Sequence, residues 1–273
     1  MSKLIKHSAC LFINNIRGIE VLKKLKNKLI IEEVILSKKF LNPKTENFLI
    51  KNKIKFSKIN KINTLKVSNL IKKTNLQIIC GFPYIFPKKI IEISKYGIIN
   101  CHAGPLPDYR GGSPLNWQLI NGEKQIGISI IKISEKIDDG KILVEHKFLN
   151  KKYNINQLHK IVNKKFSNLI FIAIKNLINK KYIKKNYKGK YWPQRKESDS
   201  EIYPFKLKAN QIYNYLKALQ HPYPNPFFYY QKKKIIIYKI VGVYKKNFLK
   251  KNYFLKIGKF FYIKCKDKVI KFL

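Results

Sequence analysis

Three side chains that could do chemistry together follow apolar runs of the chain: Asn100, His102 and Asp138. Asn100 and His102 stand two positions apart at the end of one run, and Asp138 follows a second run. An amide can donate to a developing oxyanion, an imidazole can accept a proton, and a carboxylate can orient the imidazole. Acyl transfer without a covalent intermediate needs these three groups. The pattern therefore predicts an enzyme.

The residues that flank this set favour the same interpretation. Pro105 and Pro107 stiffen the chain directly after His102, which lowers the cost of holding the imidazole in place. Arg110 precedes two glycines, so the backbone there can approach an anionic ligand closely. The sequence Asp-Asp-Gly that begins at Asp138 could also be an ordinary turn between two strands. Asp138 therefore belongs to the site only if the fold returns it to His102.

The first part of the chain alternates between two patterns. Apolar runs at residues 8–13, 29–36, 76–80 and 97–101 predict strands, and helical spacing is found over 18–28, 64–73 and around Ile91. This alternation predicts a parallel, doubly wound sheet. Ligands of such sheets lie beyond the carboxyl ends of the strands. Gly81-Phe82 and the Asn100–His102 segment fall at that edge.

The middle of the chain continues with a helix, two strands and a long helix. Ser113 and Pro114 have the residue types of a cap and a first turn, and they predict a helix over residues 115–120. Residues 127–133 and 142–148 predict two strands, and the spacing from Leu158 to Leu177 predicts one amphipathic helix.

The tail has a different character. A helical segment at residues 209–220 precedes a proline-rich turn, and strand-like runs follow at 227–230, 234–243, 252–257, 260–265 and 269–273. Short strands with turn signals predict a small antiparallel barrel or sheet. We therefore expect a catalytic domain over residues 1–185, a linker over 186–205 and a β-rich domain over 206–273.

Composition limits the class of protein. The chain has 273 residues, 45% of them hydrophobic, which favours a globular fold. A net charge of +43 would normally suggest nucleic acid or an anionic membrane. The basic residues are almost all lysine, and only Arg17, Arg110 and Arg195 are arginines. Arginine is the better bidentate reader of phosphate, so we interpret the charge mainly as a lysine bias of the composition.

The cysteines and apolar stretches predict the compartment. Cys10, Cys80, Cys101 and Cys265 are far apart without a Cys-x-x-Cys pair, which predicts reduced thiols and neither a disulfide framework nor a zinc site. The apolar run near the N-terminus is too short for a signal-peptide core, and residues 169–174 are too few for a membrane span. We expect a soluble, cytoplasmic protein with no metal and no membrane partner.

The segment from Asn100 to Leu143 resembles the signature of the folate-dependent formyltransferases. That signature contains Asn-x-His, a Leu-Pro loop that ends in Arg-Gly, an Asn-Gly pair, a Gly-Ile strand and Asp-x-Gly, all present here in order. The resemblance implies an α/β, Rossmann-like formyltransferase domain with a mostly parallel sheet, followed by a small β-rich, OB-like C-terminal domain. It also implies N10-formyltetrahydrofolate as donor and a primary amine as acceptor. Residues 81–88 resemble the loop that lines the folate pocket.

The acceptor is chosen by neighbouring residues. Methionyl-tRNA formyltransferases usually carry His-x-Ser-Leu-Leu-Pro and a basic, glycine-rich loop after the second strand. This chain has His102-Ala103-Gly104-Pro105-Leu106-Pro107, and residues 37–42 contain neither arginine nor glycine. The pattern is more similar to enzymes that formylate amino sugars linked to dTDP or UDP. We therefore favour such a nucleotide-linked amino sugar, with initiator methionyl-tRNA as the alternative and a nucleic-acid partner only in that case.

The resemblance also implies roles for single residues. Asn100 would donate to the oxyanion, His102 would take the amine proton or, if charged, stabilise the oxyanion, and Asp138 would orient His102. The residues expected at the folate are Phe82, Ile85, Phe86 and Asp138, with ordinary core packing as the alternative for the first three. The residues expected at the acceptor are Gly104, Tyr109, Arg110, Ser113 and Asn116, together with Tyr223 and His221. Arg110 could instead shape its loop, and Trp117 could equally be the anchor of its helix. The strands of the tail could also pair two subunits as a homodimer.

Overall fold

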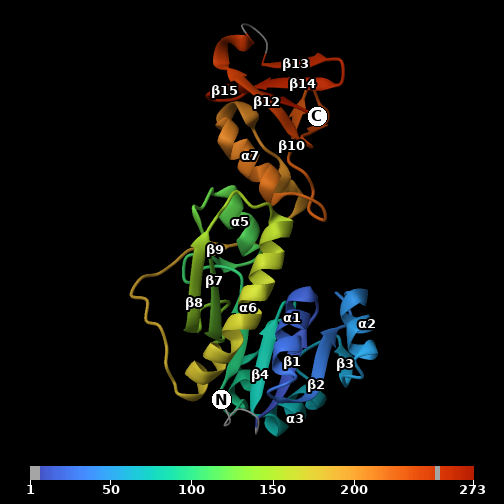
Figure 1. Ribbon diagram of the computed structural model, residues 1–273, viewed down its shortest axis with the longest axis vertical. Coiled ribbons are helices and arrows are strands. Elements are labelled where there is room, and N and C mark those ends of the chain that lie inside the picture. Colours follow the sequence, from blue (N-terminus) through green and yellow to red (C-terminus); the bar gives the residue numbers. More distant parts are fainter. Residues whose placement is uncertain (1–6, 250–252) are drawn as a thin grey trace. The chain divides into compact units, whose positions relative to one another are not determined.

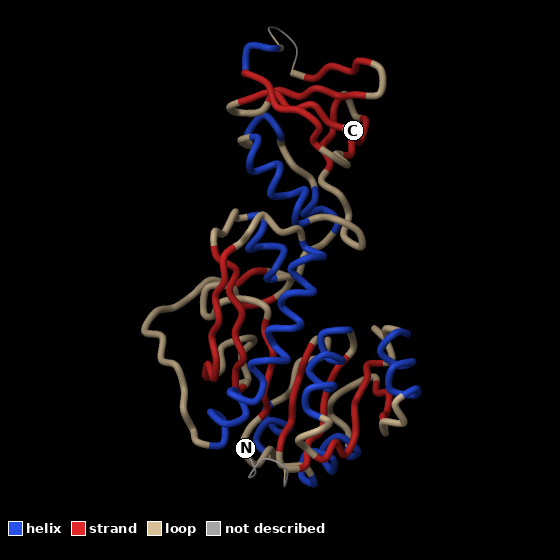
Figure 2. Tube along the Cα trace, in the orientation of Figure 1, coloured by secondary structure: helices blue, strands red, loops and turns tan. Residues whose placement is uncertain are grey.

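A seven-stranded sheet forms the centre of the computed structural model, which describes residues 7–249 and 253–273. The strand order is β3-β2-β1-β4-β5-β7-β8 (Figures 1 and 2). The first five strands are parallel, and β7 runs antiparallel to β5. The strands are β1 (Ser8–Ile13), β2 (Ile30–Ser37), β3 (Phe56–Ile59), β4 (Leu76–Cys80), β5 (Ile98–His102), β7 (Gln125–Lys132) and β8 (Lys141–Leu149). The order reverses between β1 and β4, which is where doubly wound sheets bind ligands.

Helices cover the sheet because the strands present apolar side chains on both faces. The helices are α1 (Ile16–Leu25), α2 (Pro43–Lys51), α3 (Leu65–Lys73), α4 (Lys88–Glu92) and α6 (Ile155–Ile178). Phe12 packs in one buried cluster with Ile71 of α3 and Ile90 of α4. Side chains alternate along a strand, so Ile13 faces the other side, where a Cβ on Gly18 of α1 would lie 2.3 Å from Ile13 Cβ. Glycine at position 18 therefore allows α1 to approach the sheet closely.

Helices α1 and α6 are joined on that second face. Arg17 Nε donates to Asn163 Oδ1 at 3.1 Å, and the Arg17 guanidinium lies 5.5 Å from the ring centre of Phe166. Arg17 Nη2 also lies 3.4 Å from His159 Nδ1. Burial, and then the charge of Arg17, lower the pKa of His159 to about 4. His159 is therefore a neutral packing residue at neutral pH.

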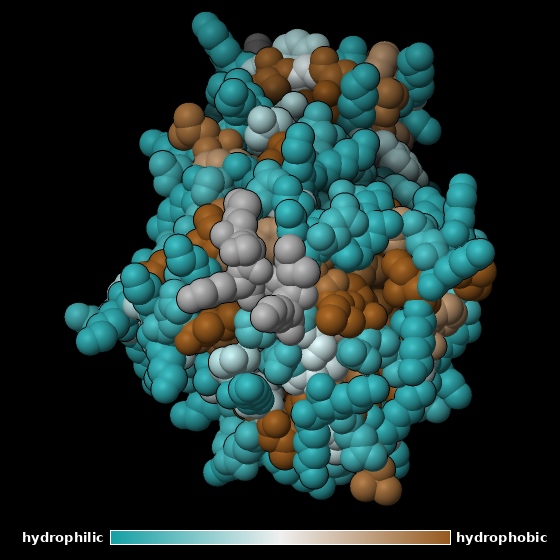
Figure 3. Space-filling view, turned by 60° about the horizontal axis from the view of Figure 1, so that its bottom comes forward, coloured by the Kyte–Doolittle hydropathy of each residue, from teal (hydrophilic) through white to brown (hydrophobic). Residues whose placement is uncertain are grey.

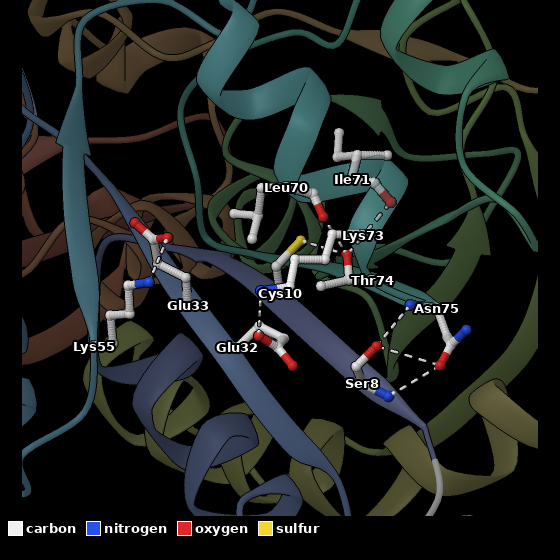
Figure 4. A network of polar contacts seen from close by, with 10 residues as sticks. All are labelled: Ser8, Cys10, Glu32, Glu33, Lys55, Leu70, Ile71, Lys73, Thr74 and Asn75. Carbon is white, nitrogen blue, oxygen red and sulfur yellow. Dashed lines mark hydrogen bonds and ion pairs between the residues drawn. The ribbon is translucent and has the colours of Figure 1, made fainter.

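A polar network joins β1, β2 and the segment between α3 and β4 (Figure 4). Ser8 N donates to Asn75 Oδ1 at 3.1 Å, and Asn75 N donates to Ser8 Oγ at 3.2 Å. Thr74 Oγ1 donates to Leu70 O at 2.8 Å and lies 3.5 Å from Cys10 Sγ. Burial raises the pKa of the Cys10 thiol to about 12. These contacts fix the entry of β1 and β4 into the sheet.

Cα packing divides the chain into two compact units that interleave along the sequence. The first unit comprises the described residues up to Gly111 together with Gly127–Phe148 and His159–Tyr191. The second comprises Gly112–Ile126, Leu149–Leu158 and the described residues from Trp192 onward. The predicted domain boundaries at residues 185 and 205 remain a prediction.

The second unit combines helices with small sheets. It contains α5 (Pro114–Ile120), α7 (Ala209–Ala218) and the hairpin of β10 (Phe227–Tyr230) and β11 (Lys233–Ile236). A four-stranded sheet has the order β12 (Ile240–Lys245), β15 (Lys268–Phe272), β14 (Phe260–Lys264) and β13 (Phe254–Ile257). Short 3₁₀ helices lie at Glu197–Ser200, Pro204–Lys206 and Lys246–Phe248, and β6 (Arg110–Gly111) pairs with β9 (Tyr191–Trp192) where the two units adjoin in sequence.

The mostly parallel sheet and the β-rich tail confirm the predicted fold class. Of the barrel and the sheet left open for the tail, the described residues form an open sheet in which β12 and β13 are the edge strands. Helix α7 ends at Ala218, short of the predicted Gln220. The predicted strand over residues 252–257 begins at Asn252, which lies outside the described residues; β13 begins at Phe254.

Some predictions were wrong or incomplete. The strand predicted over residues 234–243 is two strands, because the chain bends at Ile237, whose buried N–H donates to Pro226 O at 2.9 Å. Ser113 has a left-handed backbone (φ 49°) and makes no capping hydrogen bond with its side chain, although Pro114 does open α5. Helix α2 and strand β3 were not predicted, since one is largely polar and the other has only four residues.

Hydrophilic side chains cover most of the face drawn in Figure 3, with separate hydrophobic patches between them. Within residues 7–249 and 253–273, no helix has both the length and the apolar character to cross a bilayer.

Candidate active site

Asn100 and His102 lie at the carboxyl end of β5. This strand is held on both sides, since Asn100 pairs with Ile79 of β4 and with Ile131 of β7. Residues two apart on a strand point to the same face, so the amide and the imidazole extend side by side. Cys101, between them, points to the opposite face. A rigid central strand therefore positions both side chains.

Asp138 joins these two residues. Its carboxylate Oδ2 lies 3.3 Å from His102 Nδ1, and its Oδ1 accepts from Asn100 Nδ2 at 3.4 Å. The Gly111 N–H also donates to Oδ2 at 3.0 Å. The side chains of His102 and Asp138 are only 6% and 10% exposed, so solvent screens their contact weakly. The structure thus brings together the three residues predicted to be catalytic; their catalytic roles remain a prediction.

The loop after β5 closes over the imidazole. His102 Nε2 lies 2.6 Å from Tyr109 O, and a carbonyl can only accept, so this nitrogen donates. The Leu106 N–H donates to Ser129 Oγ at 3.0 Å and anchors the loop to β7. A Cβ on Gly104 would lie 2.9 Å from both His102 Nε2 and Tyr109 O. Glycine is therefore required at position 104 for the loop to reach His102.

The residues predicted to line the folate pocket differ in burial. Phe86 is 4% exposed and packs against Phe12 with ring centres 4.9 Å apart, as a core residue does. Phe82 is half-buried and lies 5.6 Å from the same ring. Ile85 is 66% exposed. Phe82 and Ile85 therefore keep apolar surface that a planar ring could cover, whereas Phe86 is buried and packs the loop against the core at Phe12.

Polar residues at the ends of β1 and β2 were missed by the sequence predictions. Asn14 Oδ1 accepts from the Ser37 N–H at 2.9 Å, and Asn14 Nδ2 donates to Phe40 O. Ser37 Oγ donates to Tyr84 Oη at 3.0 Å, which joins β2 to the loop after β4. Asn14 and Ser37 are both buried. The signal was present, because each is a polar residue directly after an apolar strand.

The residues predicted to bind the acceptor belong to both units. Gly104, Tyr109 and Arg110 lie in the first unit, where Tyr109 contacts His102 and Arg110 Nη1 pairs with Asp139 Oδ1 at 2.9 Å. Ser113 and Asn116 lie in the second unit and are engaged within it.

The contacts of that second group are structural. Ser113 Oγ accepts from Gln194 Nε2 at 2.9 Å. Asn116 is 2% exposed, and its Nδ2 donates to Ala218 O at 2.8 Å, which joins α5 to α7. Trp117 Nε1 donates to Pro193 O at 3.0 Å and anchors the same helix. The predicted roles of Ser113 and Asn116 at the acceptor remain predictions.

All four cysteines are free and buried. Cys80 and Cys101 lie next to each other on β4 and β5, and a hydrogen bond between them, with burial, raises the pKa of Cys101. Such thiols are poor nucleophiles. Over the part of the chain that the structure describes, no three His, Cys, Asp or Glu side chains gather as ligands of a metal ion would.

The fold and the site together define the class of protein, a doubly wound α/β domain with an amide, an imidazole and a carboxylate at the carboxyl end of a central strand. The chain belongs to the formyl transferase family, whose N-terminal domain model matches residues 6–172. This match confirms the family predicted from the motif between Asn100 and Leu143.

Several known proteins are similar to the chain. The bifunctional polymyxin resistance protein ArnA of Wigglesworthia glossinidia brevipalpis is 36% identical over 201 residues, which cover 70% of this chain and 30% of that protein. The methionyl-tRNA formyltransferase of Malacoplasma penetrans is 28% identical over 220 residues, which cover 77% of this chain and 67% of that enzyme. The chain therefore spans less than a third of the length of the first protein and about two thirds of the second.

Solved structures share the fold. WlaRD, a sugar 3N-formyl transferase crystallised in the presence of dTDP and 5-N-formyl-THF, has a TM-score of 0.69 at 23% identity, over 97% of both chains. The N-formyltransferase of Helicobacter canadensis, in complex with folinic acid and dTDP-3-aminofucose, has a TM-score of 0.68 at 20% identity, over 97% of this chain and 98% of that chain.

Proposed function

We propose that the protein transfers the formyl group of N10-formyltetrahydrofolate to the primary amine of a nucleotide-linked amino sugar. One observation carries the proposal: in a member of the formyl transferase family, the Asp138 carboxylate joins Asn100 and His102 at the carboxyl end of β5. The folate donor is supported by two proteins of similar fold that were solved with 5-N-formyl-THF or folinic acid. The exposed surface of Ile85 and Phe82, in the loop that follows β4, suits a pterin ring.

The reaction exchanges one carbon–nitrogen bond for another. The amine lone pair attacks the formyl carbon, and the carbonyl electrons move to oxygen to give a tetrahedral intermediate. The amine then loses a proton, the bond from the formyl carbon to N10 breaks, and N10 takes up a proton. The products are a formamide and tetrahydrofolate, with no oxidant or reductant required.

The residues of the site match these proton and charge movements. An N–H of the Asn100 amide can turn from Asp138, which it meets at the long distance of 3.4 Å, to the developing oxyanion. Asp138 holds Nδ1 of His102 and so fixes the direction in which Nε2 points. In the structure Nε2 donates to Tyr109 O. For His102 to accept the amine proton, Nε2 must therefore first lose its own proton to solvent and exchange this carbonyl for the amine, whereas a charged His102 could assist the oxyanion.

The acceptor class is supported by the site and by the proteins of similar fold. Gly104 occupies the place where methionyl-tRNA formyltransferases usually carry serine, and no Cβ fits there against His102 and Tyr109. Two proteins of similar fold match almost the whole chain. The one with a TM-score of 0.69 is named as a sugar 3N-formyl transferase and was solved in the presence of dTDP, and the one with a TM-score of 0.68 was solved with dTDP-3-aminofucose.

Direct assay of the full chain tests the proposal. The protein is incubated with N10-formyltetrahydrofolate and a panel of dTDP- and UDP-linked 3-amino and 4-amino sugars, and the formamide is detected by mass spectrometry. We expect turnover of at least one sugar, and a loss of about 10²- to 10³-fold in kcat for Asn100→Ala. A protein that binds folate but formylates none of the amino sugars would contradict the proposed acceptor class.

A second acceptor has a specific observation in its favour. Methionyl-tRNA formyltransferases are among the curated relatives, and the one from Malacoplasma penetrans matches 77% of this chain. Charged initiator methionyl-tRNA therefore belongs in the same assay. Formylation of the tRNA with no turnover of any amino sugar would establish the tRNA as the acceptor.

A further inference from the structure

The loop that carries Asp138 needs outside support. Residues 133–140 connect β7 to β8, and most of them are exposed. Asp138 has a left-handed backbone with φ 49°, which is costly for a residue with a Cβ. Such a conformation persists only when surrounding contacts hold it. The contacts that hold this loop therefore decide where the Asp138 carboxylate lies.

Two consecutive residues of β6 contact the loop at Asp138 and Asp139. The Gly111 N–H donates to Asp138 Oδ2 at 3.0 Å, and Arg110 Nη1 donates to Asp139 Oδ1 at 2.9 Å. The backbone of β6 is itself fixed, because the Arg110 N–H donates to Lys190 O at 3.1 Å. One short strand thus holds two neighbouring carboxylates of the loop, one at the site and one beside it.

Arg110 is better placed for this task than an ordinary surface cation. Its side chain is 18% exposed, against 40% for Asp139, so the charged head is withdrawn from solvent. Its Nε is buried and has no hydrogen-bond partner among the residues that the structure describes. The chain has few arginines among many lysines. The planar guanidinium of Arg110 can donate one N–H to Asp139 while its Nε stays buried.

We infer that Arg110 and Asp139 form a clamp that fixes Asp138 against His102, and that Arg110 is a positioning residue for the formyl transfer proposed above, on which this inference rests. Release of the clamp would let the strained loop relax and move the Asp138 carboxylate away from Nδ1. The His102 imidazole would then lose its fixed direction while both substrates still bind.

The clamp predicts a particular kinetic pattern. Asp139→Asn keeps the shape of the side chain but removes the charge, and Arg110→Ala removes the guanidinium. We expect each variant to lower kcat by roughly 10- to 100-fold, as small misplacements of catalytic groups do, with KM for folate and amino sugar changed less than about threefold. The double variant should be no worse than the poorer single variant, because both remove the same clamp.

Two further variants make the test specific. Glu135→Gln removes the exposed ion pair of Glu135 with Lys88, 3.3 Å apart and on the same loop, but it does not touch Asp139 or Arg110. It should leave kcat unchanged. Addition of millimolar guanidinium to Arg110→Ala should restore part of the lost kcat, whereas the same addition to Asp139→Asn should not.

A direct contact between Arg110 and the acceptor would give a different result. Arg110→Ala would then raise KM for the amino sugar, and Asp139→Asn would retain wild-type kinetics. Additive losses in the double variant would equally contradict a shared clamp. Either outcome overturns the inference while leaving the proposed function intact.

A measurement without turnover separates the inference from the proposed function. Amide hydrogen exchange of the folded variants, with folding checked by thermal unfolding, should be faster across residues 134–140 and at Gly111 in Arg110→Ala and Asp139→Asn, but not across β5. Glu135→Gln should exchange like the wild type. Unchanged exchange in the loop of the first two variants would overturn the clamp, even for a chain that formylates none of the acceptors.

Discussion

Polar groups cluster at both ends of the parallel strands, and the two clusters are built differently. Near the strand entries, Ser8 of β1 and Asn75, which precedes β4, bond to each other, and Thr74 Oγ1 donates to Leu70 O of α3 (Figure 4). At the carboxyl ends, the Asp138 side chain bonds to Asn100 and to the Gly111 N–H, and Asp138 keeps a left-handed backbone. The first cluster gives hydrogen-bond partners to backbone groups at the strand entries. In the second, a residue with a strained backbone brings its carboxylate to an imidazole. This difference predicts that one end of the sheet governs stability and the other governs catalysis.

The largest effect is expected at the carboxyl ends. His102→Gln keeps a polar side chain at the position but removes the imidazole, and we expect kcat to fall by about 10²- to 10⁴-fold. The free energy of unfolding should change by about 1 kcal/mol or less, because the amide can still donate one hydrogen bond. Steady-state kinetics and urea unfolding of the same preparation measure both values. A large loss of stability with the activity retained would reverse the proposed contrast.

A smaller effect concerns pH and the contact between α1 and α6. The pKa of His159 is about 4 in the folded chain, below its ordinary value of 6.5, so the unfolded chain binds more protons between these values. This contribution to stability is complete above pH 6.5 and is lost as the pH falls toward 4. Between pH 7 and pH 5, His159→Gln should lose about 2 kcal/mol less unfolding free energy than the wild type. Parallel pH dependences in urea unfolding would contradict the assigned burial of a neutral imidazole.

Gln77 tests the strand entries. It is fully buried, and its Nε2 donates to Ile71 O at 3.1 Å and to Thr74 O at 3.0 Å. Gln77→Leu removes both of these hydrogen bonds, and Ile71 O then keeps the longer contacts from the Thr74 N–H at 3.3 Å and Thr74 Oγ1 at 3.5 Å. The change should cost about 1–3 kcal/mol of unfolding free energy, with kcat near that of the wild type. Thermal and urea unfolding measure the first value. A matching fall in kcat at a temperature where the variant is fully folded would show that the two ends are coupled.

The smallest effect is expected from an exposed ion pair in the same region. Glu32 Oε2 and Lys73 Nζ lie 3.5 Å apart, and the lysine side chain is 71% exposed. Glu32→Gln should change the unfolding free energy by less than about 0.5 kcal/mol, with less change still at high salt. A clear loss in urea unfolding would mean that this pair, and not only the buried amides, stabilises the strand entries.

The parallel sheet was predictable because its longer strands are mainly apolar runs between glycines and polar residues. Residues 76–80 are apolar except for Gln77, and β4 has these bounds. Segments without such contrast were missed: α2 is largely polar and β3 has four residues that alternate weakly. The break between β11 and β12 at Ile237 was also missed. It depends on hydrogen bonds from the Ile237 N–H to Pro226 O and from the Tyr238 N–H to Leu273 O, and Leu273 is distant in sequence.

The candidate site could be predicted in part for the same reason. Asn100 and His102 are local to one strand end, so their spacing alone placed them together. The return of Asp138 was inferred from a family resemblance, because no local pattern reports a contact across 36 residues between His102 and Asp138. Asn14 and Ser37 carried a local signal, as polar residues after apolar runs, but the hydrogen bonds that join them to each other and Ser37 to Tyr84 depend on tertiary packing.

The interleaving of the two units has a consequence for how this chain can be cut or recombined. Helix α5 lies between segments of the first unit in sequence but belongs to the second, where the Asn116 amide binds Ala218 O. A shortened chain that stops before α7 would leave that buried amide without its acceptor and expose the apolar side of α5. Exchange of tails between related proteins would therefore have to carry residues 112–126 along with the tail. A single junction therefore cannot exchange the second unit as a whole, and new acceptor specificities are better sought by substitutions within an intact chain.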